Sequence, residues 1–74
     1  MSTSEDNDAV AALLQQAASY QRQGELDQAL RSYRHVLAMR PDHAEALQGA
    51  GIVCGQRGRF DEARDFFSAA CAAQ

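Results

Sequence analysis

Apolar residues recur along this 74-residue chain at spacings of three and four, the period of an α-helix with one buried face. Gly24, Pro41 and Gly58 interrupt the pattern. Glycine can take the left-handed conformation that ends a helix, and proline lacks the N–H needed to continue one. The interruptions predict four helices. No segment alternates apolar and polar residues over a useful length, so we expect no sheet.

The four predicted helices each present one apolar stripe. The second helix runs from about Asp27 to Met39, the third from about His43 to Arg57 and the fourth from about Phe60 to Ala73. The stripes are, in chain order, Leu13, Ala17 and Tyr20; Ala29, Leu30, Tyr33, Val36 and Leu37; Leu47, Gly51 and Cys54; and Ala63, Phe67 and Ala70. Asp42 followed by Glu45 is a plausible capping pair for the third helix. Gly51 weakens a helix, which predicts a close approach of two helices there.

The chain repeats itself when residues 10–40 are laid on residues 44–74, an offset of 34. Matched pairs include Gly24/Gly58, Asp27/Asp61, Ala29/Ala63 and the aromatic pair Tyr33/Phe67. A repeat of this length indicates an array of two-helix units that bury their apolar faces by stacking.

A helix-turn-helix unit of this length resembles the tetratricopeptide repeat. The residues that carry the resemblance are Ala17, Tyr20, Gly24, Ala29, Tyr33 and Pro41, and then Gly51, Cys54, Gly58, Ala63 and Phe67. It implies an all-α, right-handed α-solenoid of two repeats, 9–42 and 43–74, with four antiparallel helices. Residues 1–8 are acidic and lack an apolar face, so we expect a disordered leader.

The second unit lacks the proline that would close it, which would lie just past Gln74. We therefore expect a truncated second repeat without a cap helix, in a fragment of a longer protein or in an array completed by self-association. Its last helix carries Phe60, Phe66 and Phe67 and would keep an uncovered apolar side. This predicts a homodimer or a swapped oligomer, formed through the last helix.

The resemblance implies a protein-protein interaction module, a scaffold that holds a peptide or helical segment of a partner in a groove lined by the first helix of each pair. Transferred by position, the groove residues are Ala11, Leu14, Gln15, Ala18 and Arg22, with Glu45, Gln48, Gly49, Ile52 and Gln56. Helical spacing separately places each set on one stripe, turned away from the core. Leu14, Ala18 and Gly49 stand where chaperone-docking members of the family carry Lys and Asn, so we do not expect that function.

The charge of the chain and its N-terminal sequence argue against several other classes of function. The net charge is -3, from 7 basic residues, all Arg, and 10 acidic ones, with no basic cluster, so we expect no nucleic acid and no membrane as partner. The acidic N-terminus does not resemble a signal peptide, which favours a cytoplasmic protein. Asp27 and Arg31 lie at the spacing of a surface ion pair.

The candidate catalytic residues are few. Cys54 and Cys71 fit no metal or redox spacing and are interpreted as free, buried and apolar in a reducing compartment. His35 and His43 have no nucleophile or paired carboxylate at a useful spacing. We therefore expect no enzyme, no cofactor and no metal.

Three other functions stay open. The chain could be the N-terminal appendage of a larger bacterial-type enzyme, a glycosyl-, sulfo- or methyltransferase, that recruits substrate or drives oligomerisation. It could be a purely self-assembling element. An RNA-binding helical repeat is more distant, because the grooves of such repeats are basic.

Overall fold

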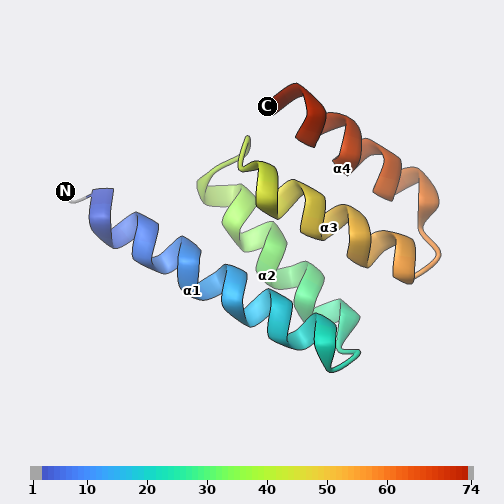
Figure 1. The fold of residues 1–74 in the computed structure, drawn as a ribbon, viewed down its shortest axis with the longest axis horizontal. Coiled ribbons are helices and arrows are strands. Elements are labelled where there is room, and N and C mark those ends of the chain that lie inside the picture. Colours follow the sequence, from blue (N-terminus) through green and yellow to red (C-terminus); the bar gives the residue numbers. More distant parts are fainter. Residues whose placement is uncertain (1–2, 74) are drawn as a thin grey trace.

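The computed structural model describes the backbone of residues 3–73 and the side chains of residues 7–73, and this part is all-α (Figure 1). Helix α1 spans Thr3–Arg22, α2 Leu26–Met39, α3 Ala44–Gln56 and α4 Phe60–Ala73. Residues 3–73 contain no strand. The predicted fold class of four helices in two helix-turn-helix units is confirmed.

The helices lie side by side in chain order, and each runs antiparallel to the next (Figure 1). The Cα atoms extend 39 × 29 × 14 Å, so the molecule is one layer of helices. Helix α2 packs against both α1 and α3, and α3 packs against α4. The first helices of the two units, α1 and α3, therefore point the same way and meet only lightly.

The turns within the two units are built alike, as the repeat predicts. Gly24 and Gly58 have φ angles of 80° and 81°, in the left-handed region. The N–H of Glu25 donates to the carbonyl of Tyr20 at 2.8 Å, and the N–H of Arg59 donates to the carbonyl of Cys54 at 2.8 Å. This pattern closes a helix and satisfies its last carbonyls. Equivalent residues therefore set the same turn twice.

The core consists mostly of small side chains, which let the helices approach closely. Ala17, Ala29, Val36, Ala46, Ala50, Val53 and Cys54 are all 0% exposed. A Cβ added at Gly51 would lie 2.9 Å from Cε1 of Phe67. The close approach of α3 and α4 predicted at Gly51 is thus present.

Two helix starts differ from the sequence predictions. Helix α1 begins at Thr3, so it includes residues 3–8 of the segment for which we expected disorder; residues 1–2 lie outside the described part. Acidic residues in the first turns of a helix are stabilised by its dipole. In addition, Arg40 Nη2 donates to Oδ1 of Asn7 at 2.9 Å and ties the start of α1 to the end of α2.

The cap of α3 is also not the predicted Asp42. His43 is the N-cap residue, and its Nδ1 accepts a hydrogen bond from the N–H of Ala46 at 3.3 Å. An imidazole can fill this role because a neutral ring has one nitrogen free to accept. The predicted capping pair of Asp42 with Glu45 was wrong.

Helix α4 is less buried than its predicted stripe implies. Ala63 and Ala70 are buried, but Phe67 is 42% exposed and Phe60 is 72% exposed. Cys71, which we expected to be buried, is exposed, whereas Cys54 is buried, and both are free thiols. Within residues 3–73 no further helix covers the outer side of α4, which explains both differences.

Glycine-to-alanine substitutions along α3 test this packing. At Gly49, a Cβ would overlap the ring of Tyr33, whereas at Gly55 it would meet nothing within 4 Å. Gly49→Ala should lower the free energy of unfolding by about 1–3 kcal/mol through overpacking. Gly55→Ala, the matched control, should raise it by up to about 1 kcal/mol through helix propensity. Urea denaturation measures both, and a stabilised Gly49→Ala variant would contradict the packing.

Candidate functional site

The residues predicted to line a groove lie on the first helices, and nearly all are accessible. Gly49 is buried, and each of the others is exposed or half-buried. We call the accessible set the first-helix surface: Ala11, Leu14, Gln15, Ala18 and Arg22 of α1, with Glu45, Gln48, Ile52 and Gln56 of α3.

Ile52 is the most accessible large apolar side chain of the first-helix surface, with 46% of its area exposed. Leu14 is half-buried and packs against the core, so only part of it faces outward. Ala18 of α1 is half-buried, and Ala11 is exposed. An apolar contact from a partner would therefore centre on Ile52.

Gly49 belongs to the junction between the two units and not to the accessible surface. The ring of Tyr33, on α2, lies directly over the Gly49 backbone. Tyr33 is itself only 6% exposed. The sequence prediction placed Gly49 correctly on α3, but it missed that the absence of a side chain there makes room for the Tyr33 ring.

Gln21 belongs with this surface, although it was not among the residues predicted to line the groove. The Tyr33 hydroxyl donates to Oε1 of Gln21 at 3.2 Å, and Nε2 of Gln21 donates to Oε1 of Gln56 at 3.4 Å. This chain of hydrogen bonds joins α1, α2 and α3 at one end of the first-helix surface. The position of Gln21 in the sequence, one turn after Ala18 and next to Arg22, was the signal that could have predicted this.

Tyr33 is held as a hydrogen-bond donor. Burial raises the pKa of its hydroxyl above the ordinary value of 10.0, and the Glu45 carboxylate raises it further. Both effects disfavour the phenolate. The hydroxyl therefore stays protonated at neutral pH and keeps its hydrogen bond to Gln21.

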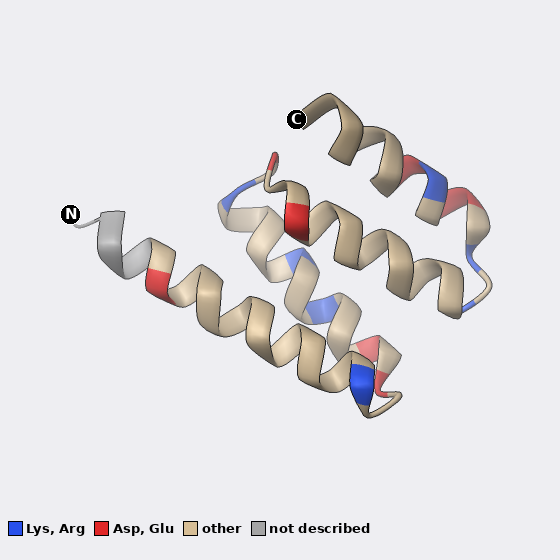
Figure 2. Cartoon of the chain, in the orientation of Figure 1, with Lys and Arg blue, Asp and Glu red and all other residues tan. Residues whose placement is uncertain are grey.

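Charges mark the two ends of the first-helix surface. Arg22 is in the last turn of α1, and Glu45 is in the first turn of α3. Because α1 and α3 run the same way, these opposite charges lie at opposite ends, with mainly uncharged residues between them (Figure 2). The surface is therefore electrically polarised along the helices.

Residues 7–73 hold no group of three or more His, Cys, Asp or Glu side chains that could hold a metal ion. Burial raises the pKa of the Cys54 thiol, the Glu62 carboxylate adds to this, and neighbouring arginines oppose it. A protonated, buried thiol is a poor nucleophile. No helix in the described part is long and apolar enough to cross a membrane.

Comparison with known proteins identifies the repeat. The family model described as "Tetratricopeptide repeat" matches residues 8–74. The chain is also similar to Tetratricopeptide repeat protein 8 of Caenorhabditis elegans, with 45% identity over 45 residues. That match covers 61% of this chain but only 9% of the relative, so the chain spans a small part of that protein.

The raised pKa of Tyr33 predicts a pH dependence. In the folded chain, the Tyr33 hydroxyl has a pKa above 10.0, the ordinary value that applies to the unfolded chain. The stability from this group should be fully present below that pH and lost as pH rises through the folded pKa. Ultraviolet absorbance of tyrosinate should show a late-titrating tyrosine that Tyr33→Phe removes. If Tyr33→Phe leaves the late phase in place, the assignment to Tyr33 fails.

Proposed function

The chain belongs to the tetratricopeptide repeat family, whose repeats are generally protein-protein interaction modules, and we propose that it binds a peptide or helical segment of a partner on the first-helix surface. The observation that carries the proposal is Ile52, which is 46% exposed on α3 between the polar residues Gln48 and Gln56. An accessible branched side chain among small residues and amides suits a partner that offers one apolar anchor and hydrogen-bonding groups around it.

The length of the surface limits the partner segment. From Glu45 to Gln56 the rise along α3 is about 16 Å at roughly 1.5 Å per residue. This corresponds to about five residues of extended peptide at roughly 3.3 Å each, or to about three turns of a helix at roughly 5.4 Å per turn. The proposed partner is thus a short linear motif or one helix.

The charges at the two ends of the first-helix surface favour one direction of the bound partner segment. A segment with a basic group near Glu45 and an acidic group near Arg22 would be favoured over the reversed segment. Such rim charges contribute more to orientation and association rate than to affinity. The Gln15, Gln48 and Gln56 amides can donate to and accept from an extended backbone, which fixes its register.

Site-specific photo-crosslinking tests this surface with a matched pair of glutamines. Gln48 is exposed on α3 within the first-helix surface, and Gln28 is exposed on α2 outside it. A photoreactive amino acid at position 48 should form adducts with a partner in extracts of the source cell, whereas the same group at position 28 should not. Ile52→Arg should abolish the adducts at 48, while Met39→Arg, which adds the same charge on α2, should leave them.

Equal adduct yields at positions 28 and 48, or adducts at 48 that survive Ile52→Arg unchanged, would mean that partners bind elsewhere. Circular dichroism provides the folding control. Nearly half of the Ile52 side chain is exposed, so its replacement should leave the helical content as it is.

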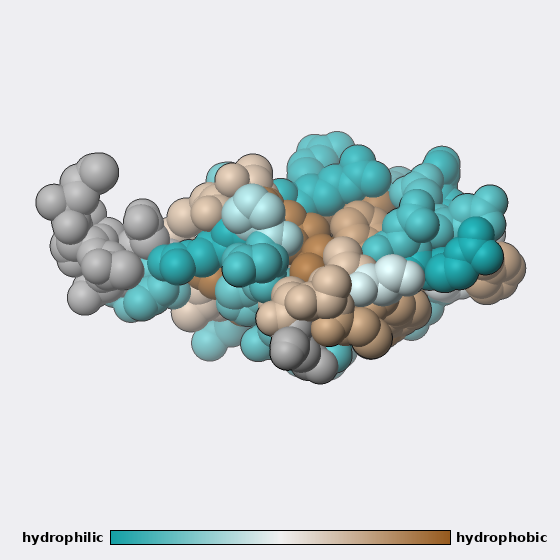
Figure 3. Space-filling model, turned by 90° about the horizontal axis from the view of Figure 1, so that it is seen from above, coloured by the Kyte–Doolittle hydropathy of each residue, from teal (hydrophilic) through white to brown (hydrophobic). Residues whose placement is uncertain are grey.

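The outer side of α4 supports self-association as a second function. Phe60 and Phe67 are exposed there. Apolar surface surrounds the C-terminal end of this helix in the view of Figure 3. Large exposed aromatic groups are typical of association surfaces. We therefore propose a homodimer formed through α4.

Phe60→Glu tests the dimer with little risk to the fold. Position 60 is the first residue of α4, and a glutamate there complements the helix dipole. Sedimentation velocity should show that the dimer dissociation constant rises by at least about tenfold, as expected for loss of an exposed aromatic anchor. Met39→Glu is the control and should leave it unchanged. A folded monomer at high micromolar concentration would contradict self-association.

A role as the recruiting or oligomerising appendage of a larger glycosyl-, sulfo- or methyltransferase is the alternative, and the coding sequence around these 74 residues would decide it. A cytoplasmic location is supported by the two free cysteines, which suit a reducing compartment.

A further inference from the structure

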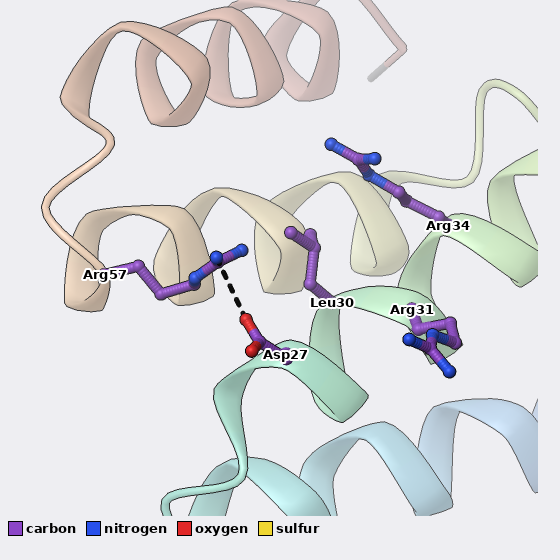
Figure 4. Close-up of a pocket in the computed structure, with 5 residues that line it drawn as sticks. All are labelled: Asp27, Leu30, Arg31, Arg34 and Arg57. Carbon is purple, nitrogen blue, oxygen red and sulfur yellow. Dashed lines mark ion pairs between the residues drawn. The ribbon is translucent and has the colours of Figure 1, made fainter.

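A hollow of about 390 Å³ lies beside α2 and shares no lining residue with the first-helix surface. It is lined by Asp27, Leu30, Arg31 and Arg34 of α2 and by Arg57 at the end of α3. In Figure 4, Leu30 lies between Arg57 and Arg34, and Asp27 points toward Arg57. The four α2 residues share one helical face because they are three and four positions apart. Leu30 is 5% exposed, so it is an apolar floor beneath charged walls.

The hollow is positively charged although the whole chain has a net charge of -3. Three arginines line it against one aspartate. Beside them, Glu62 lies 3.6 Å from Arg34 and 3.1 Å from Arg59. With Arg59 and Glu62 included, this corner holds four guanidinium groups and two carboxylates, which leaves two positive charges unbalanced. Ion pairs within the described part thus neutralise this corner only in part.

The sequence predicted that Asp27 would pair with Arg31, and the structure contradicts this. Asp27 Oδ1 instead lies 2.9 Å from Arg57 Nη2, across the junction of α2 and α3. The Arg57 side chain is 27% exposed, whereas that of Asp27 is 78% exposed. Arg57 is therefore held in place by packing, while the carboxylate that reaches it can turn away into solvent. Within residues 7–73, Arg31 has no ion pair.

We propose that this hollow binds an oxyanion carried by a protein segment, either a pair of carboxylates or one phosphorylated side chain. The planar guanidinium group matches the geometry of both, and Arg57 already forms an ion pair with one oxygen of the Asp27 carboxylate. The incoming oxyanion replaces the Asp27 carboxylate at Arg57 and contacts Arg34, while Arg31 adds positive charge at the rim of the hollow. Leu30 contacts the methylene groups of the side chain that carries the oxyanion.

A protein segment suits the hollow better than a nucleic acid does. A phosphate backbone needs positive charge spread along its length, and this chain has no lysine and a net charge of -3. One compact hollow with a small surplus charge fits a single anionic group or two adjacent ones.

The test uses three peptides of equal length that differ only at two adjacent central positions. These hold two glutamates, one phosphoserine with one serine, or two serines. Calorimetric titration of the intact chain at low ionic strength should show binding of a charged peptide and none of the serine peptide. Tighter binding of the glutamate peptide identifies carboxylates as the source, and tighter binding of the phosphoserine peptide identifies a phosphoryl group.

Variants connect this binding to the hollow. Arg31 and Arg34 are both exposed. The double variant Arg31→Gln, Arg34→Gln should bind the charged peptide at least about tenfold more weakly, because hydrogen bonds between charged groups are the strong ones. Asp27→Asn should strengthen binding, because it removes the competing carboxylate from Arg57; a purely structural role would not produce this gain. Arg64→Gln is the matched control on α4, where Arg64 pairs with Asp61 and its side chain is 78% exposed. Ile52→Arg should leave this binding unchanged, which separates the hollow from the first-helix surface.

Three results would overturn the proposal. The charged peptides could bind no better than the serine peptide. Arg64→Gln could weaken binding as much as the double substitution does. A single-stranded RNA oligonucleotide could bind more tightly than either charged peptide, which would assign the arginines to a different class of partner.

Discussion

The packing of the Tyr33 ring on the bare backbone of Gly49 joins the two helical units, and the remaining structure depends on it. Tyr33 is 6% exposed, and its hydroxyl continues through Gln21 to Gln56. One side chain of α2 thus contacts α3 and reaches α1. Because α1 and α3 meet only lightly by themselves, this contact sets how the two halves of the first-helix surface stand relative to each other.

Phe67 shows what happens to the equivalent residue when no further helix follows. It occupies the place of Tyr33 in the second unit, but 42% of it is exposed. Its ring rests on Gly51 within its own unit, because no helix of the described part lies on the outer side of α4. The same residue class at the same repeat position is therefore a junction in the first unit and a partly exposed ring in the second.

Local features of this fold were predictable from the sequence, and contacts between units were not. The turns at Gly24 and Gly58 and the extent of α4 follow from residues close in the chain. The burial of Gly49, the role of Gln21 and the pairing of Asp27 with Arg57 depend on how α1, α2 and α3 are spaced. A helical pattern gives each residue a face but does not show which side chain from another helix lies against it.

Nuclear Overhauser spectroscopy of the intact chain tests the central contact most directly. The ring protons of Tyr33 should show strong cross-peaks to the α-protons of Gly49, whose resonances should move upfield because they lie against the face of an aromatic ring. Gly55, on the same helix with nothing within 4 Å of its Cβ position, should keep ordinary shifts and show no aromatic cross-peak. Ordinary shifts at Gly49, without cross-peaks to Tyr33, would contradict the junction on which both proposed surfaces depend.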